Sequence, residues 1–354
     1  MPLSFVFDQP SYRVVFGAGS LDRLPDEVTR LGARRALIIS TPAERFFAED
    51  AVHRLGPLAA GVFAGAVMHH PIEVVREARA RATEFEADCY VTIGGGTTTG
   101  TGKAIALETG LPVVAVPTTY AGSEMTPIYG ITDGGVKKTG RDRRVLPRSV
   151  IYDPVLTLSL PPRVAGPSGI NAMAHCVEGL YAADGNPIVT LMAAEGIRAL
   201  AGALPRVVES PADLDARADA LYGAWLAGIV LGTASIGLHH KLCHTLGGTF
   251  SLPHADVHTV ILPQATAYNR TAAPAAMRIA AQALQATDAA QGIFDLIARI
   301  GAPTALKDIG MPVDGLDRAA TLATENQYPN PRPVEYGPVR ALLESAYYGR
   351  RPEL

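Results

Sequence analysis

The residues of this chain with the clearest potential for chemistry are histidines gathered in one stretch. Five of the nine histidines lie in residues 235–263. His240 and His244 are four residues apart, which on a helix places both rings on one face. Gly247-Gly248 then predicts a break in that helix, and His258 follows on the next segment. This arrangement is typical of a small polar site inside an apolar surround.

A second pair of polar residues on a predicted helix could join this group. Asn171 and His175 also stand four residues apart, in the run GINAMAH. The combined set of candidate site residues is Asn171, His175, His240 and His254, with His244 beside them. The alternative is a set of core or surface histidines that cluster by chance, and the regular spacing argues against it.

A glycine-rich turn is the second feature with chemical potential. The run IGGGTTTG follows a predicted strand and leads into a predicted helix. Backbone N–H groups at such a helix N-terminus suit a pyrophosphate. The candidate residues are Gly94, Gly95, Gly96, Thr97 and Thr98. The alternative is an ordinary glycine-rich turn between a strand and a helix, because the run is not GxGxxG.

The elements that must position these residues fall into two halves. Short apolar runs, such as 35–40, 89–93 and 113–116, alternate with helical patterns early in the chain. Ala- and Leu-rich helical segments follow without comparable strand runs. We therefore predict an α/β dinucleotide-binding domain with a doubly wound, mostly parallel sheet over residues 1–155. An all-α domain over 156–354 would carry the histidines, facing the cleft between the domains.

Composition excludes several classes of function. The 354 residues are 48% hydrophobic with a net charge of −3, and no basic patch or nucleic-acid motif occurs. No apolar run approaches the roughly 20 residues of a membrane span, and the N-terminus does not read as a secretory signal. Three widely spaced cysteines argue against a disulfide framework. We expect a cytoplasmic protein with no nucleic-acid or membrane partner.

The histidine motifs resemble those of the iron-containing alcohol dehydrogenase family, whose pattern runs GxDAxxH, HxxxHxLG and PH. In that family the Asp and three of the histidines hold the metal, so the resemblance implies His175, His240 and His254 as the ligand positions. It also implies that His244 lies near the nicotinamide. This chain departs from the pattern at Asn171, where metal-binding members carry Asp.

The resemblance extends to the cofactor-binding segments. The run PTTYAGSE is similar to the family's PTTAGTGSE element. It implies that the hydroxyls of Thr118, Thr119 and Ser123 hydrogen-bond the phosphates and the nicotinamide end. The run TDGGVKK resembles a segment that supplies a lysine near the nicotinamide ribose, here Lys138. A plain charged turn is the alternative for Lys138.

The end of the first core strand bears on cofactor choice. NAD-specific members of the family tend to carry an Asp there, which binds the ribose 2′-OH and repels a 2′-phosphate. This chain carries Thr41, with Arg45 nearby. We therefore predict that both NADH and NADPH are accepted.

The Asn171 departure bears on the metal. An amide in place of the carboxylate removes the one anionic ligand, so metal affinity should fall, although three histidines alone can bind zinc. Our hypothesis is that no metal is required, and that imidazoles act directly as proton donors and oxyanion stabilisers. If a metal binds at all, its ligands would be His175, His240 and His254.

Longer runs are similar to one branch of the family, the maleylacetate reductases. They include GGGTTTGTGKAIA, GINAMAHCVEGLYA, LHHKLCHTLGGTFSLPHADVHTVILP and ENQYPNPRPVE, so the resemblance covers nearly the whole chain. It implies a homodimer that reduces the C=C bond of maleylacetate to 3-oxoadipate with NADH or NADPH, in the breakdown of aromatic compounds. Such a small dicarboxylate needs cations. Lys241 and Arg332, with Tyr328 close by, are the candidates, and solvated surface charges are the alternative.

Three other functions remain open at this point. A metal-dependent alcohol or polyol dehydrogenase would share the fold, but Asn171 and the longer motifs count against it. A lyase resembling dehydroquinate synthase would share the domain plan, but its site should be richer in Lys, Arg and Glu. A non-enzymatic binding protein is disfavoured by the density of histidines.

Overall fold

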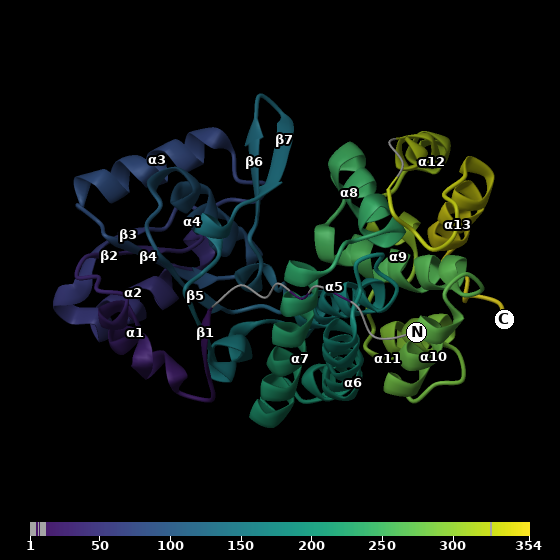
Figure 1. Ribbon diagram of the computed structural model, residues 1–354, viewed down its shortest axis with the longest axis horizontal. Coiled ribbons are helices and arrows are strands. Elements are labelled where there is room, and N and C mark those ends of the chain that lie inside the picture. Colours follow the sequence, from purple (N-terminus) through teal and green to yellow (C-terminus); the bar gives the residue numbers. More distant parts are fainter. Residues whose placement is uncertain (1–4, 6, 8–11, 326–327) are drawn as a thin grey trace. The chain divides into compact units, whose positions relative to one another are not determined.

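The computed structural model describes residues 5, 7, 12–325 and 328–354. The chain divides into two compact units between Leu160 and Pro161 (Figure 1). This division falls slightly after the boundary expected at 155/156, because the 3-10 segment η6 (Pro154–Ser159) still belongs to the first unit. The sequence of residues 3–17 is typical of a strand and hairpin, and this segment lies partly outside the described residues. Within them, β1 covers Arg13–Phe16.

The first unit is built on a six-stranded sheet. Its strands are β1, β2 (Ala36–Ile39), β3 (Ala59–Phe63), β4 (Cys89–Gly94), β5 (Val113–Pro117) and β8 (Ser149–Tyr152). They run in the order β1-β8-β5-β4-β2-β3, and every pair is parallel. The predicted α/β fold with a mostly parallel sheet is confirmed. Buried strands of this kind read as continuous apolar runs because both faces of the sheet are covered.

Helices cover both faces of this sheet. They are α1 (Leu24–Arg30), α2 (Arg45–Leu55), α3 (Ile72–Glu84) and α4 (Gly96–Thr109). Side chains alternate along β2, so Ala36 and Ile38 pack with α1 and α2, whereas Leu37 and Ile39 pack with α3 and α4. Figure 1 shows the two helix pairs on opposite sides of the strands. Helix α2 was not among the predicted elements.

A β-hairpin projects from the first unit. Strand β6 (Ile128–Asp133) pairs antiparallel with β7 (Val136–Arg141). The connecting Gly134 and Gly135 have φ values of 56° and 78°, which a two-residue hairpin turn of this kind requires.

The second unit is helical, and its described residues form no strand. Its helices are α5 (Pro162–Leu180), α6 (Pro187–Glu209), α7 (Leu214–Thr233), α8 (Leu238–Phe250), α9 (His254–Asn269), α10 (Pro274–Ala283), α11 (Ala289–Arg299), α12 (Leu316–Thr324) and α13 (Tyr336–Tyr348). The predicted all-α domain is confirmed. The predicted break at Gly247-Gly248 is wrong, because α8 continues to Phe250 and ends where Ser251 adopts a left-handed conformation.

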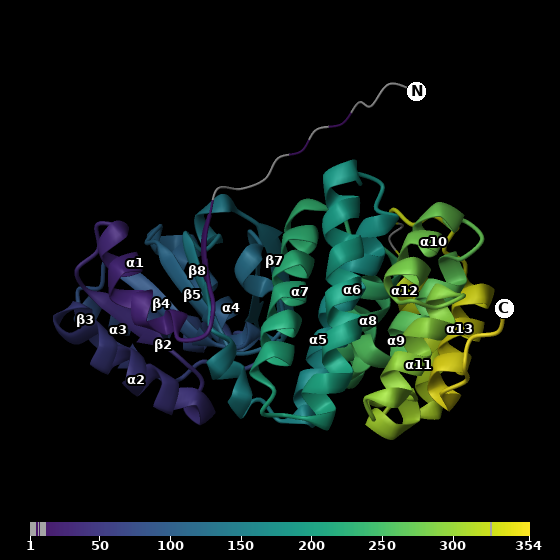
Figure 2. The same cartoon turned by 90° about the horizontal axis from the view of Figure 1, so that it is seen from below.

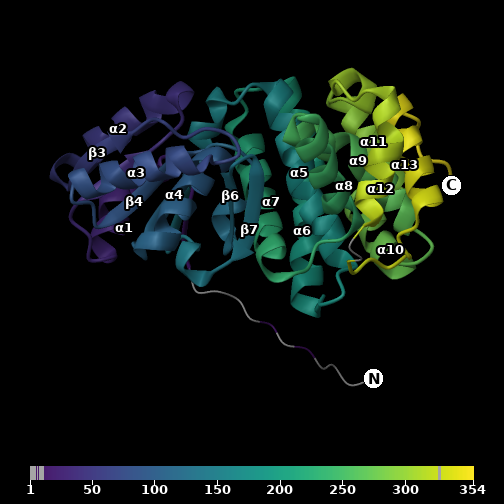
Figure 3. The ribbon, with the colours of Figure 1, turned by 90° about the horizontal axis from the view of Figure 1, so that it is seen from above.

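Two helix groups make up this unit. Helices α5, α6 and α7 pack against one another (Figure 2). By length and apolar composition α6 could cross a membrane, contrary to the expectation that no run approaches this length, but 44% of its apolar window is buried inside the unit. Helices α8, α9, α12 and α13 share a second apolar core that includes Leu246, Val260, Ala320 and Leu343 (Figure 3). The ends of α8 and α9 that carry histidines lie where these two groups of helices meet.

Candidate active site

A buried carboxylate organises the start of α8. Glu178 lies on α5, and its oxygens accept the backbone N–H groups of Gly237 at 3.1 Å and His239 at 2.8 Å. The side chain is 1% exposed. The first N–H groups of a helix have no partner within the helix and carry the positive end of its dipole. Glu178 therefore satisfies this helix end and fixes it against α5.

The same carboxylate orients His240. The Nδ1–H of His240 donates to Glu178, and both side chains are buried. Because a carboxylate only accepts hydrogen bonds, this contact fixes the proton on Nδ1 and leaves Nε2 as the reactive nitrogen. Nε2 is buried, with no hydrogen-bond partner in the described part of the chain. A buried nitrogen of this kind is available to a bound molecule.

Six imidazoles form one continuous cluster around His240. The ring of His175 stacks on that of His240 with centroids 5.1 Å apart, and the rings of His244 and His258 lie at 6.0 Å and 5.0 Å from it. His254 joins the group through His258, at 4.4 Å. The structure therefore brings together all four histidines predicted from the sequence.

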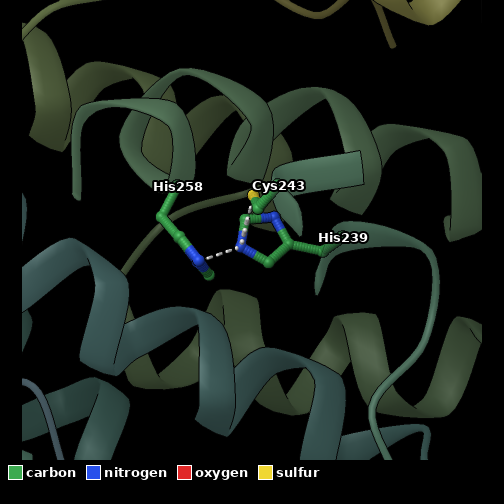
Figure 4. Close-up of side chains that lie close together, drawn as sticks. All are labelled: His239, Cys243 and His258. Carbon is green, nitrogen blue, oxygen red and sulfur yellow. Dashed lines mark hydrogen bonds between the residues drawn. The ribbon is translucent and has the colours of Figure 1, made fainter. Parts of the chain in front are cut away.

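His239 and His258 were not assigned roles from the sequence, and both lie in the cluster. Figure 4 shows His239 between its neighbours: its Nε2 lies 2.9 Å from His258 Nδ1 and 3.6 Å from the Cys243 sulfur. These three side chains are fully buried. Residues four apart on α8 (His239 and Cys243) and on α9 (His254 and His258) are brought together by packing of the two helices. The i, i+4 spacing of His258 from His254 was the signal that could have identified it.

Burial determines the charge of the inner rings. The pKa values of His175, His239 and His258 are lowered well below the ordinary value, first by desolvation and then by the neighbouring imidazoles. These rings are neutral at pH 7 and act as hydrogen-bond donors or acceptors without charge. His244 and His254, in contrast, are exposed.

Asn171 lies one turn before His175 on α5, as predicted. Its side chain is 5% exposed, and Oδ1 has no partner among the residues described. The Nδ1 of His175 is also buried without a partner there. Unpaired buried polar atoms are rare in native structures and commonly mark a place where a ligand binds.

The donor atoms that lie close together belong to a different set of side chains from the predicted fallback metal ligands. Within the described residues, the one group of three whose donor atoms all lie within 4.8 Å of one another is His239, Cys243 and His258. His175, His240 and His254 do not meet this condition. In that other group the histidines already hydrogen-bond each other.

The three residues predicted to bind carboxylates lie in the helical unit. The ammonium of Lys241 lies 5.8 Å from the centre of the Tyr328 ring, and no carboxylate of the described residues pairs with it. The guanidinium of Arg332 stacks on Tyr268 at 4.2 Å and donates to the Tyr268 carbonyl. The Tyr328 hydroxyl donates to the Ala323 carbonyl. Lys241 therefore has no carboxylate partner among the described residues, whereas Arg332 is already engaged by Tyr268.

The glycine-rich turn in the α/β unit has the expected geometry. Helix α4 begins at Gly96, directly after β4, with Gly95 at its N-cap. Gly94 has φ of 150°, and a Cβ there would lie 2.4 Å from the Thr98 hydroxyl oxygen. A Cβ on Gly95 would lie 3.0 Å from Thr119. The backbone therefore approaches its neighbours closely, as a pyrophosphate-binding turn requires.

The second predicted loop is held by a buried lysine that had no predicted role. Lys103 on α4 donates to the Thr126 hydroxyl and the Ile128 carbonyl, both at 2.9 Å, and also to the Ser123 carbonyl. Its burial lowers the pKa of the ammonium to about 7. Lys138, by contrast, is 68% exposed and pairs with Asp133 at 3.1 Å on the hairpin. This geometry favours the charged-turn interpretation of Lys138.

Thr41 lies at the carboxyl end of β2 and does not act alone. Its hydroxyl donates to Glu44 at 2.9 Å, and Thr118 donates to the other Glu44 oxygen at 2.7 Å. The prediction of dual cofactor use assumed that no carboxylate stands at this strand end. The Glu44 carboxylate occupies this position, although Glu44 comes three residues after Thr41 in the chain.

Comparison with known proteins defines the class to which this chain belongs. The chain matches the family described as "Iron-containing alcohol dehydrogenase" over residues 10–154 and the "Fe-containing alcohol dehydrogenase family, C-terminal" over residues 166–347. The chain belongs to this family, and it is an oxidoreductase.

Within the family, several of the similar proteins are maleylacetate reductases. The chain is 59% identical over 349 residues to "Maleylacetate reductase" of Burkholderia cepacia, covering 99% of each chain. It is also similar to the crystal structure of maleylacetate reductase from Agrobacterium tumefaciens, with 51% identity, a TM-score of 0.96 and 99% of each chain covered. The crystal structure of maleylacetate reductase from Rhizobium sp. strain MTP-10005 matches with the same identity and TM-score, covering 99% of this chain and 100% of that one.

The contact of Glu178 with His240 predicts the effect of Glu178→Gln. The amide keeps the shape of the side chain, but it removes the charge and places an N–H donor against groups that themselves donate. We expect turnover to fall at least about tenfold, as for other losses of an oriented acid–base group. The dissociation constant of NADH, measured by fluorescence titration, should stay within about twofold because the cofactor turn lies in the other unit.

Glu209→Gln is the matched control, since it removes one exposed carboxylate from the same unit. Turnover of Glu178→Gln close to that of the control would show that the carboxylate does not orient a catalytic histidine. Thermal unfolding of both variants separates this effect from a loss of fold.

Proposed function

We propose that this protein is an NAD(P)H-dependent maleylacetate reductase, which reduces the C=C bond of maleylacetate to give 3-oxoadipate in the breakdown of aromatic compounds. The observation that carries the proposal is the buried imidazole cluster anchored by Glu178, with Asn171 where metal-binding relatives of the family carry Asp. The similarity to maleylacetate reductases over the whole chain supports the substrate.

The reaction needs a hydride and a proton on neighbouring carbons. The glycine-rich turn and the Thr118 loop would hold a reduced nicotinamide, which would supply the hydride to the alkene carbon β to the ketone. The ketone oxygen then carries negative charge as an enolate. The protein must hold that charge and deliver a proton to the carbon next to the ketone.

The histidine cluster can perform both tasks. Neutral His175 has a buried, unpaired nitrogen that can hydrogen-bond the enolate oxygen in a site of low polarity, where such bonds are strongest. The hydrogen bond to Glu178 fixes the orientation of the His240 ring and leaves its buried Nε2 for proton transfer. Exposed His244 and His254 can return protons from solvent. Lys241 offers a cation for one substrate carboxylate.

We further propose that no metal is required. A conjugated enone is already activated toward hydride, so the charge that a metal would stabilise can be held by hydrogen bonds. Asn171 contributes a neutral amide oxygen in place of an anionic ligand, which supports the proposal.

Cytoplasmic location and a homodimer are also part of the proposal. Cys89, Cys176 and Cys243 are free and buried, which suits a reducing compartment. The resemblance to the family is the support for the homodimer. The partner molecule would be a small dicarboxylate, with no nucleic acid or membrane involved.

The direct test is oxidation of NADH or NADPH by freshly prepared maleylacetate, before and after dialysis against a strong chelator. We expect a steady rate that the chelator leaves unchanged, with 3-oxoadipate as the product. Activity that disappears and returns with iron or zinc would contradict the metal-free proposal. If NADH or NADPH binds but maleylacetate is not reduced at all, the proposed substrate is wrong.

The position of His244 beside His240 predicts the effect of His244→Gln. Its ring lies 6.0 Å from that of His240 and 6.4 Å from that of His254. Loss of a proton-transfer group should lower turnover at least about tenfold. His53→Gln, which changes an exposed histidine of the α/β unit, is the control and should retain full activity. Near-normal turnover of His244→Gln would remove His244 from the mechanism.

A further inference from the structure

One carboxylate of the α/β unit has contacts that the proposed reaction does not use. Glu44 ends the 3-10 turn η2 (Pro42–Glu44), directly after β2. Oε2 accepts from the Thr41 hydroxyl at 2.9 Å, and Oε1 accepts from the Thr118 hydroxyl at 2.7 Å. The carboxylate therefore connects the loop after β2 to the loop after β5.

These two loops lie on either side of the glycine-rich turn. Strand β4 lies between β2 and β5 in the sheet, and all three are parallel. A Cβ on Gly94, at the end of β4, would lie 2.7 Å from Glu44 Oε2. The carboxylate thus lies directly against the first glycine of the turn.

This is the place where a doubly wound sheet binds its ligand. The chain passes from β2 outward to β3, and then returns to β4 on the other side of β2. Such a reversal opens a crevice at the carboxyl ends of the two strands, and dinucleotides bind there. The pyrophosphate takes the glycine-rich turn, and an acidic side chain after the neighbouring strand receives the hydroxyls of the adenosine ribose.

Glu44 has the capacity for this second contact. An ionised carboxylate has roughly four lone-pair sites for hydrogen bonds, and the two threonine hydroxyls occupy one on each oxygen. Glu44 is only partly buried, so the remaining sites can reach a ligand. A ribose 2′-OH can donate to such an oxygen, whereas a 2′-phosphate brings about two negative charges against it.

The basic residue next to Glu44 in the chain is already paired with another carboxylate. Arg45 follows Glu44 directly, but its Nε lies 2.9 Å from the Glu49 carboxylate. Its guanidinium is therefore paired within α2. A 2′-phosphate would therefore be repelled by the Glu44 carboxylate, and the Arg45 guanidinium, paired with Glu49, would not neutralise it.

We propose that Glu44 determines cofactor specificity: its carboxylate, held by Thr41 and Thr118, accepts the adenosine ribose hydroxyl of NADH and disfavours the 2′-phosphate of NADPH. The inference rests on the proposed use of a nicotinamide dinucleotide. It replaces the expectation from Thr41 alone that the two cofactors are equivalent.

The test is equilibrium binding of NADH and of NADPH, without substrate, to the full-length protein and to Glu44→Gln. We expect the wild-type protein to bind NADH at least about tenfold more tightly, and Glu44→Gln to reduce that ratio at least about tenfold, mainly by tighter NADPH binding. Glu44→Asp, which keeps the charge, should retain a preference for NADH. Glu77→Gln removes an exposed carboxylate of α3 and should leave the ratio unchanged.

The outcomes separate this inference from the proposed function. If both cofactors bind and Glu44→Gln leaves their ratio unchanged, the inference is wrong while the reductase proposal stands. If neither cofactor binds to the wild-type protein, both are wrong. A Glu77→Gln variant with the same ratio change as Glu44→Gln would show a general charge effect and would also overturn the inference.

Discussion

The carboxylate of Glu178 is the group on which the histidine site depends. It is buried on α5, and it accepts two backbone N–H groups at the start of α8 together with the imidazole N–H of His240. A buried carboxylate without such partners would be strongly unfavourable. The helix N-terminus and the imidazole together make this position stable, and in return the carboxylate fixes which nitrogen of His240 can react.

The other imidazoles follow from that fixed point. Packing of α9 against α8 brings His258 and His254 to the same place, and α5 contributes His175 one turn before Glu178. Burial keeps the rings of His175, His239 and His258 neutral, since their pKa values are lowered well below the ordinary range. Neutral donors in a site of low polarity can stabilise an enolate without a metal, which fits the replacement of an anionic ligand by Asn171.

The sequence predicts those parts of the structure that local patterns encode. Alternating strand and helix patterns predict the parallel sheet, and i, i+4 spacing predicts His240 with His244 and Asn171 with His175. Contacts between distant segments were missed. Glu178 is three residues from His175 but 62 residues from His240, and no local pattern links that pair. For the same reason Lys138, which lies in a familiar motif, was assigned a role, whereas Lys103, whose partners only folding brings together, was not.

The end of β2 shows the same limit. Thr41 stands at the strand end where NAD-specific members of the family carry Asp. The prediction that both NADH and NADPH are accepted was based on this residue type alone. The turn after the strand then brings the Glu44 carboxylate back to the Thr41 hydroxyl, a contact that depends on the 3-10 geometry of Pro42–Glu44. The residue type at position 41 is therefore a weaker indicator of cofactor specificity than the carboxylate that folding brings next to it.

The central claim is that hydride reaches the alkene carbon while the histidines hold the enolate and supply the proton. The most direct measurement uses maleylacetate and reduced cofactor deuterated at the transferable position of the nicotinamide, with the product examined by NMR. The account predicts deuterium on the carbon β to an intact ketone. Deuterium on a carbinol carbon would show that the ketone itself is reduced, and the enzyme would then be an alcohol dehydrogenase in its chemistry as well as in its family.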